Sequence, residues 1–218
     1  SMGTMENFLK QLQLKVSIYE LVDQTPMDIW VRASQLTFRT NQFNLNTKRR
    51  SEPELIDLVK NKNHRIWMVQ VEDRFGQYGW VGLIIGVSKS AHYFVDTFLL
   101  SCRVLARGVE HALLDHLAQV AFVAGNKTLQ LNFRPSEKNM PMEEFLEKIT
   151  WDNKLVNSSD TIFELALPTE NYRQNDLVIE ILKELPVNKV NENINKEKPV
   201  ILPPKEKEIL VQQEDTLI

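Results

Sequence analysis

Three consecutive segments of this chain have the length and composition of β-strands, and only short turns separate them. They are residues 65–72 (RIWMVQVE), 78–87 (YGWVGLIIGV) and 93–100 (YFVDTFLL). Strands joined by turns this short must run antiparallel to one another. Four of the seven glycines fall between Gly76 and Gly86, within the first hairpin. The sequence therefore predicts an antiparallel meander in the middle of the chain.

Helical and strand patterns flank this meander on both sides. Thr25 and Pro26 provide an N-cap and a first helical residue, Ser51 to Glu54 form a capping box, and Gly125 follows the longest apolar stripe. The predicted helices cover residues 5–14, 25–39, a segment from residue 51, 108–124 and 142–149, and the predicted strands 15–22, 127–133 and 161–167.

This order of elements indicates an α/β (α+β) protein. A meander followed by a strand-helix-strand crossover gives a mixed, mostly antiparallel central sheet with helices on both faces. The order is similar to that of the GCN5-related N-acetyltransferase (GNAT) fold, expected here over residues 5–172. Residues 173–187 include the amphipathic segment DLVIEILKEL and predict a C-terminal helix, and residues 188–218, which lack aromatic residues, predict a flexible linker or docking tail.

The composition argues against several classes of protein. With 26 basic and 29 acidic residues the net charge is −3, which disfavours nucleic-acid binding through bulk electrostatics. No apolar run approaches the ~20 residues of a membrane helix, and the start of the chain does not have the pattern of a signal peptide. One cysteine and four histidines show no metal-site spacing. We expect a cytoplasmic domain without a membrane, nucleic-acid or metal partner.

The most informative stretch is residues 96–108 (DTFLLSCRVLARG), where a strand leads into the longest predicted helix. Helix N-termini expose unpaired N–H groups and a partial positive charge, so they bind phosphate. GNAT acetyltransferases bind the phosphate of coenzyme A or phosphopantetheine there, through an Arg/Gln-x-x-Gly-x-Gly/Ala signature. Residues 103–108 (RVLARG) match this signature, although Ala106 replaces the first glycine. Arg103, Arg107 and Gly108 are the predicted cofactor-binding residues, and an ordinary strand-to-helix turn is the alternative.

Four motifs, in order along residues 14–168, resemble the C-terminal acyltransferase-like half of FkbH-like proteins. Members of that family join a HAD-like phosphatase domain to a GNAT-like domain and load a glyceryl unit from 1,3-bisphosphoglycerate onto an acyl carrier protein in polyketide biosynthesis. The motifs are TNQFN (40–44), DRFGQYG (73–79), DTFLLSCRVLARGVE (96–110) and FRPSEKN (133–139).

The resemblance implies an S-acyltransferase domain that passes a glyceryl-type acyl group to the phosphopantetheine thiol of an acyl carrier protein. The Asp-x-Asp-x-Thr motif of the phosphatase half does not occur in this sequence. We therefore expect a HAD-like phosphatase domain as a partner, in cis or in trans. The magnesium that serves that half is not expected in this domain.

Cys102 and Asp96 are the predicted catalytic residues. The family motif holds a cysteine at the position of Cys102, which suggests that its thiol transiently carries the acyl group. A thiol ahead of a helix N-terminus and close to arginines is expected to be more nucleophilic; a buried structural cysteine is the alternative. Asp96 shares the strand face of Cys102 but lies about 20 Å away in an extended strand, so we expect it to orient the substrate. A salt-bridged strand acid is its alternative.

Polar residues of two other motifs are the predicted substrate-binding residues. Asn41, Gln42 and Asn44 follow the end of a helix, where amide side chains also commonly cap or turn the chain. Lys138 and Asn139 precede the last core helix, where they also serve as caps in many proteins. The family motifs favour contact with substrate hydroxyls and phosphate.

Two other functions stay open. The first is acetyl-CoA-dependent N-acetyl transfer without Cys102, although Phe145 stands where many GNAT acetyltransferases have a general-acid tyrosine. The second is a non-catalytic docking domain of a HAD/GNAT assembly, with Ala106 as a sign of lost chemistry.

Overall fold

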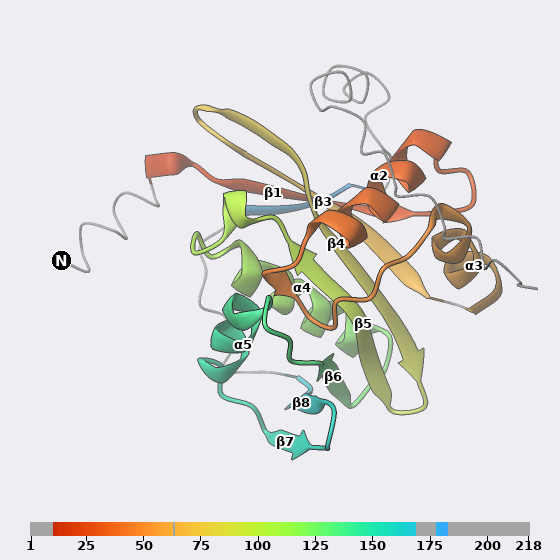
Figure 1. The fold of residues 1–218 in the computed structure, drawn as a ribbon, viewed down its shortest axis with the longest axis vertical. Helices are drawn as coiled ribbons and strands as arrows, with labels where there is room; N and C mark the ends of the chain where they lie inside the picture. The colour runs from red at the N-terminus through yellow and green to blue at the C-terminus, as the bar shows by residue number, and fades with distance from the viewer. Residues whose placement is uncertain (1–10, 63, 169–177, 183–218) are drawn as a thin grey trace, which may run out of the picture. The chain divides into compact units, whose positions relative to one another are not determined.

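A computed structural model describes residues 11–62, 64–168 and 178–182 of the 218-residue chain. All of them belong to one compact unit, Ser1–Leu185, and the remainder, Pro186–Ile218, is a second unit. The described residues form a mixed sheet of nine strands with helices on both faces (Figure 1). The α/β class and the mostly antiparallel sheet expected from the sequence are confirmed.

The sheet has the strand order β7-β8-β6-β5-β4-β3-β1-β9, and β2 pairs separately with β5. The helices are α2 (Met27–Arg39), α3 (Glu52–Lys62), α4 (Val109–Val123) and α5 (Met140–Glu147), with a 3₁₀ turn, η1, over Cys102–Val104. The strands are β1 (Lys15–Leu21), β2 (Phe43–Asn44), β3 (Arg65–Asp73), β4 (Gly76–Lys89), β5 (His92–Leu100), β6 (Thr128–Phe133), β7 (Asn153–Val156), β8 (Thr161–Ala166) and β9 (Val178–Leu182).

The central meander and the crossover are as predicted. β3, β4 and β5 pair antiparallel in sequence order, and α4 leads from β5 to β6, which pairs parallel with β5. Parallel neighbours need such a crossover because a tight turn cannot reverse the chain direction twice.

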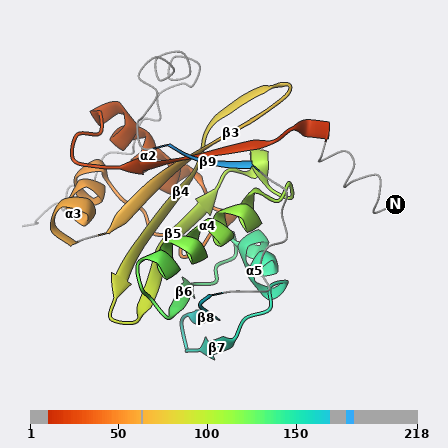
Figure 2. The same ribbon diagram turned by 180° about the vertical axis from the view of Figure 1, so that it is seen from behind.

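Two layers of apolar side chains hold the helices to the sheet. One buried cluster joins α4 and α5 to one face, with Leu113, Leu117 and Phe145 among its members. On the opposite face α2 contacts β4 and α3 contacts β3. Figure 1 shows α2 in front of the sheet, and Figure 2, seen from behind, shows α4 in front of it. The site described below lies at the edge of the first cluster.

The helix predicted over residues 173–187 is wrong where the structure describes it, because residues 178–182 form strand β9. This segment pairs parallel with β1, with Val178 opposite Lys15 and Leu182 opposite Tyr19. The free edge of β1 offers backbone partners to a segment rich in β-branched residues, and tertiary pairing overrides its helical periodicity. The tail predicted over residues 188–218 and most of the first helix, residues 5–14, lie outside the described residues.

The two predicted helix starts have different outcomes. The Ser51–Glu54 capping box is present, since a Glu54 carboxylate oxygen accepts the Ser51 backbone N–H at 2.7 Å. The predicted cap at Thr25 is wrong. Its hydroxyl oxygen accepts the backbone N–H of Val22 at 2.9 Å and closes the turn after β1, and Pro26 occupies the N-cap position of α2.

Candidate functional site

The parallel strands β5 and β6 pair only along their first halves. Their register runs from His92 opposite Thr128 to Val95 opposite Leu131, and β5 then continues for five residues, to Leu100. Beyond this point the two strand edges face a gap rather than each other. Such an edge carries unpaired N–H and C=O groups that a ligand's amides can pair with.

Strand β2 fills this gap with the chain's own backbone. It pairs antiparallel with the end of β5, Phe43 opposite Leu100 and Asn44 opposite Leu99. The next residue, Leu45, bonds to both sides: its N–H donates to the Phe98 carbonyl at 3.0 Å, and its carbonyl accepts the N–H of Arg134 at 2.9 Å. The strand edges at the gap are therefore bonded within the protein.

An aromatic contact anchors β2 in this position. The Phe43 ring is 2% exposed, with its centroid 5.4 Å from that of Phe98 and 5.2 Å from that of Phe145. Edge-on and tilted ring pairs of this kind add to the stabilisation from burial. Phe145, which stands where a catalytic tyrosine was considered, is a packing partner of β2.

Asp96 lies in a β-bulge of β5. Ile85 of β4 pairs with Thr97 and Gly86 pairs with Val95, so Asp96 has no partner on β4. The extra residue inverts the alternation of side chains, and Phe98 rather than Thr97 joins the α4-side cluster with Val95. The prediction that Asp96 and Cys102 share one strand face is therefore wrong.

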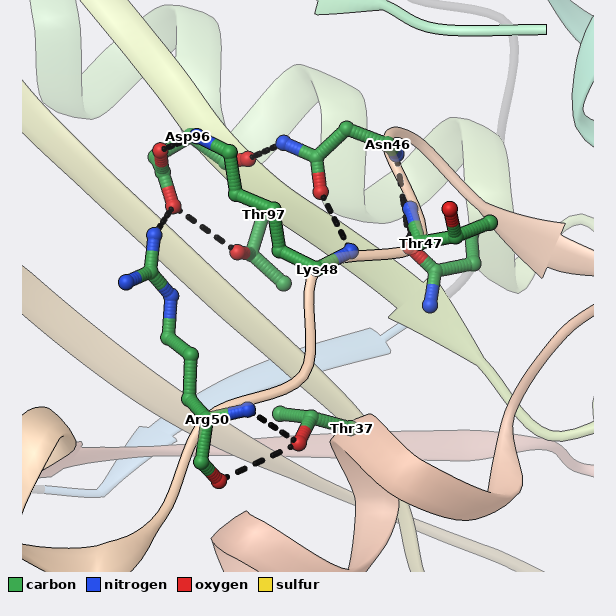
Figure 3. A network of polar contacts seen from close by, with 8 residues as sticks. Thr37, Asn46, Thr47, Lys48, Arg50, Asp96 and Thr97 are labelled. Atoms are coloured by element: carbon green, nitrogen blue, oxygen red, sulfur yellow. Dashed lines mark hydrogen bonds and ion pairs between the residues drawn. The ribbon is translucent and has the colours of Figure 1, made fainter. Parts of the chain in front are cut away.

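The Asp96 carboxylate holds the segment that follows β2 (Figure 3). It makes ion pairs with Lys48, at 2.7 Å, and with Arg50, and the Thr97 hydroxyl donates to it at 3.0 Å. The Asn46 side-chain amide donates to the Asp96 backbone carbonyl. Burial raises the pKa of Asp96, but the hydrogen bond and charge of Lys48 and the charge of Arg50 outweigh burial, so the net pKa lies below its ordinary value. This is the salt-bridged strand acid of the alternative interpretation.

The positions of Asn44 and Asn139 are those of the loop-closing alternative, and their contact with substrate stays a prediction. Asn44 is fully buried; its side-chain amide donates to the Thr40 carbonyl at 2.9 Å, and its side-chain oxygen accepts the Thr47 N–H at 2.9 Å. Asn139 is 1% exposed, and its amide nitrogen donates to the backbone carbonyls of Asn44 and Arg134, both at 2.9 Å. Both amides are used within the chain because their loops bury backbone groups that need partners.

The other predicted substrate residues lie nearer the surface. Gln42 and Lys138 are exposed, and the half-buried Asn41 accepts a hydrogen bond from the Arg49 guanidinium through its side-chain oxygen. Their contact with substrate stays a prediction.

Three of the four motifs therefore meet around β2. We refer to Asn44, Asn46, Asp96 and Asn139 as the β2 cluster. Sequence reasoning did not single out Asn46, Lys48 or Arg50. The signal was present in the three consecutive cations, Lys48 to Arg50, which begin four residues after the end of the TNQFN motif.

Cys102 lies in a different environment, the Cys102 loop, which comprises residues 101–107 between β5 and α4. The Ser101 N–H donates to the Val81 carbonyl at 2.7 Å, and Val104 is fully buried, so both ends of the 3₁₀ turn are fixed. Cys102 is a free thiol with an exposed side chain. The alternative of a buried structural cysteine is wrong, and the thiol faces solvent on an anchored turn.

The two predicted phosphate-binding arginines differ. Arg103 is exposed, and its Nε–H donates to the Ser101 hydroxyl at 3.2 Å. Arg107 donates to the Tyr78 hydroxyl at 2.6 Å and lies 3.7 Å from the Asp73 carboxylate. This contact joins the DRFGQYG motif of the β3–β4 hairpin to the Cys102 loop and engages the Arg107 charge within the chain.

Gly108 is the N-cap of α4 and has a left-handed backbone with φ of 84°. Ala106, which replaces the first glycine of the signature, also has positive φ, at 59°. Its N–H donates to a Glu110 carboxylate oxygen at 2.9 Å. One of the amides that a phosphate would need at this helix end is already bonded to a carboxylate of the chain.

With this geometry the chain is similar to solved structures of acetyltransferases. The ribosomal-protein-S18-alanine N-acetyltransferase of Escherichia coli has 15% identity and a TM-score of 0.50, over 73% of this chain and 99% of that one. The fold is the GNAT fold. A domain from Methanocaldococcus jannaschii has 12% identity and a TM-score of 0.50, over 71% of this chain and 99% of that one. No family model matches the sequence, and no curated protein is significantly similar to it.

Two further observations concern ions and membranes. The described residues contain no group of three or more His, Cys, Asp or Glu side chains placed to hold a metal ion. None of the helices in the described ranges is long and apolar enough to cross a membrane.

Proposed function

We propose that this protein is an S-acyltransferase domain that carries an acyl group on Cys102 and passes it to the phosphopantetheine thiol of an acyl carrier protein. The observation that carries the proposal is the exposed thiol on a 3₁₀ turn held at both ends. A nucleophile on a fixed turn presents its reacting atom in one position, which favours attack on a bound thioester.

The chemistry balances as two acyl transfers. The Cys102 sulfur attacks the acyl-phosphate carbonyl carbon of 1,3-bisphosphoglycerate, a new C–S bond forms, the C–O bond to the phosphate breaks, and the phosphate departs with the thiol proton. In the second step the carrier's thiol attacks the same carbonyl, and Cys102 regains its proton. One thioester replaces another, so the second step needs no further energy source.

The geometry supports this scheme over direct transfer from acetyl-CoA. Strand β2 and Leu45 bond to the end of β5 and to Arg134, the residue after β6, so these backbone groups are not available to a pantetheine arm. An arm that reaches an exposed thiol from the solvent side does not need these groups. The carrier's phosphate would then meet Arg103, which is exposed next to the thiol.

The glyceryl identity of the acyl group rests on the four FkbH-like motifs. Under the same resemblance a HAD-like phosphatase domain, in cis or in trans, removes the phosphate ester of the glyceryl group and leaves its acyl bond intact. In this proposal the domain described here transfers the acyl group and takes no part in the dephosphorylation. The reaction takes place in the cytoplasm.

Intact-protein mass spectrometry tests the proposal. The protein is incubated with an acyl carrier protein loaded with a glyceryl thioester, so that the exchange runs back onto Cys102. We expect a mass adduct on the wild type and on the matched variant Ser101→Ala, and none on Cys102→Ala. A Cys102→Ala variant that moves the glyceryl group at the wild-type rate would exclude the covalent route.

A docking domain without chemistry is the second candidate, and the filled gap between β5 and β6 favours it. It predicts that the carrier protein binds equally to wild type and Cys102→Ala while neither becomes acylated. Adduct formation on the wild type decides between the two functions.

A further inference from the structure

A carboxylate of the protein itself, that of Glu110, lies at the N-terminus of α4. The Glu110 side chain, in the first turn of the helix, folds back so that one carboxylate oxygen accepts the Ala106 N–H at 2.9 Å. A carboxylate is favoured here by the positive end of the helix, as a bound phosphate would be. Glu110 thus occupies the position that an anionic ligand would take.

The second oxygen of Glu110 is an unusual feature. Glu110 is 8% exposed, and its other carboxylate oxygen has no hydrogen-bond partner among the described residues. Burying a carboxylate oxygen without a partner is unfavourable, so this arrangement is not explained by local stability alone. It places a buried carboxylate at the helix end with only one of its two oxygens hydrogen-bonded.

The neighbouring cations do not cancel this charge. Arg107 binds Tyr78 and lies 3.7 Å from Asp73, on the β3–β4 hairpin. Arg103 points to solvent and bonds to Ser101. A pyrophosphate brought to this helix end would come close to the buried Glu110 carboxylate, and like charges repel strongly where water is excluded.

We propose that Glu110 is a specificity-determining residue that excludes free coenzyme A from the Cys102 loop. Coenzyme A carries a pyrophosphate and a further phosphate, whereas the phosphopantetheine of a carrier protein carries a single phosphodiester. Repulsion by Glu110 therefore acts mainly on the free cofactor. The inference rests on the proposed function, since it concerns the choice between two sources of the same thiol.

Calorimetric titration with coenzyme A and with inorganic pyrophosphate tests the proposal on the full chain. Glu110→Gln keeps a side-chain oxygen that can accept the Ala106 N–H and removes the charge, so we expect affinity for both ligands to rise about tenfold or more. Affinity for pantetheine, which has no phosphate, should stay unchanged. Glu143→Gln is the matched control because Glu143 is an exposed acid in the first turn of α5.

A second variant separates Glu110 from the replaced glycine. Ala106→Gly restores the signature and relieves the left-handed alanine but leaves the carboxylate in place, so it should not gain anion affinity. The proposal would be overturned if Ala106→Gly gained affinity for coenzyme A and pyrophosphate while Glu110→Gln did not. It would also be overturned if the wild type bound coenzyme A as tightly as Glu110→Gln does. These titrations need no acyl donor, so failure of the Cys102 experiment leaves their result unaffected.

Discussion

The β2 cluster consists of motif residues together with Asn46, and the Cys102 loop lies within a motif, but their environments are opposite. In the β2 cluster the side chains of Asn44 and Asn139 are buried and bonded within the chain. In the Cys102 loop the side chains of Cys102 and Arg103 are exposed, while the Ser101 backbone and the side chains of Val104 and Arg107 anchor the loop. The comparison teaches that residues of one set of motifs can have two kinds of environment, buried side chains that close the gap between β5 and β6 and exposed side chains on an anchored backbone.

Removing the Asp96 carboxylate should have the largest effect. Asp96→Ala leaves the partly buried Arg50 cation without its ion pair, and breaking a buried pair costs about 3–4 kcal/mol. Urea unfolding at neutral pH measures the loss, and Asp23→Ala, at an exposed position, should change stability by less than about 0.5 kcal/mol. Equal midpoints for the two variants would mean that Asp96 does not hold the β2 cluster together.

Acid should lower the free energy of unfolding through the buried side chain of His116 in α4. Burial, and then the charge of Arg65, lower the pKa of His116 from 6.5 to about 4. Between these pH values the unfolded chain binds a proton that the folded chain does not, so stability is complete above pH 6.5 and falls by about 3 kcal/mol towards pH 4. Denaturant unfolding at pH 7 and at pH 4.5 measures this effect. The free energy of unfolding should fall less for His116→Leu than for the wild type, and an equal fall in both proteins would refute the prediction.

A neighbouring pair of substitutions tests the comparison within one motif. Asn139→Ala removes the donor to the Asn44 and Arg134 carbonyls and should cost about 2 kcal/mol. Lys138→Ala, on the adjacent exposed residue, should cost less than about 0.5 kcal/mol. Thermal unfolding of the two variants and the wild type measures both losses of stability. If Lys138→Ala lost as much stability as Asn139→Ala, the distinction between buried and exposed motif residues would not hold.

The smallest effect on stability is expected at Cys102 itself. Its side chain is exposed, so Cys102→Ala should shift the free energy of unfolding by less than about 0.5 kcal/mol. The same variant is expected to lose acyl loading entirely. A loss of several kcal/mol would identify the thiol as a structural residue instead.

Much of the architecture could be predicted from local patterns. Strand composition and short turns gave the meander of β3, β4 and β5, and Gly108 and Gly125 bounded the longest helix. β2 and β9 were missed for a common reason: each is a short segment that becomes a strand because a distant edge offers it backbone partners. Such pairing leaves no periodic trace in a single sequence.

The candidate site was predicted unevenly. Cys102 was found from its motif, and its exposure then removed the structural alternative. Asn44 and Asn139 were interpreted as substrate contacts because amides suit both hydroxyl recognition and loop closure, and only burial distinguishes these uses. Glu110 could have been noticed as an acid in the first turn of a helix expected to bind phosphate.

The bulge at Asp96 has a consequence for protein engineering. It divides β5 into two frames: His92 to Val95 pair with β6, and beyond the bulge Leu99 and Leu100 pair with β2. A chimera that exchanges the thiol-bearing turn between related domains should therefore join its two parents at residue 96. A junction that adds or deletes one residue elsewhere in the strand would turn Phe98 and Leu100 away from the core that supports the turn.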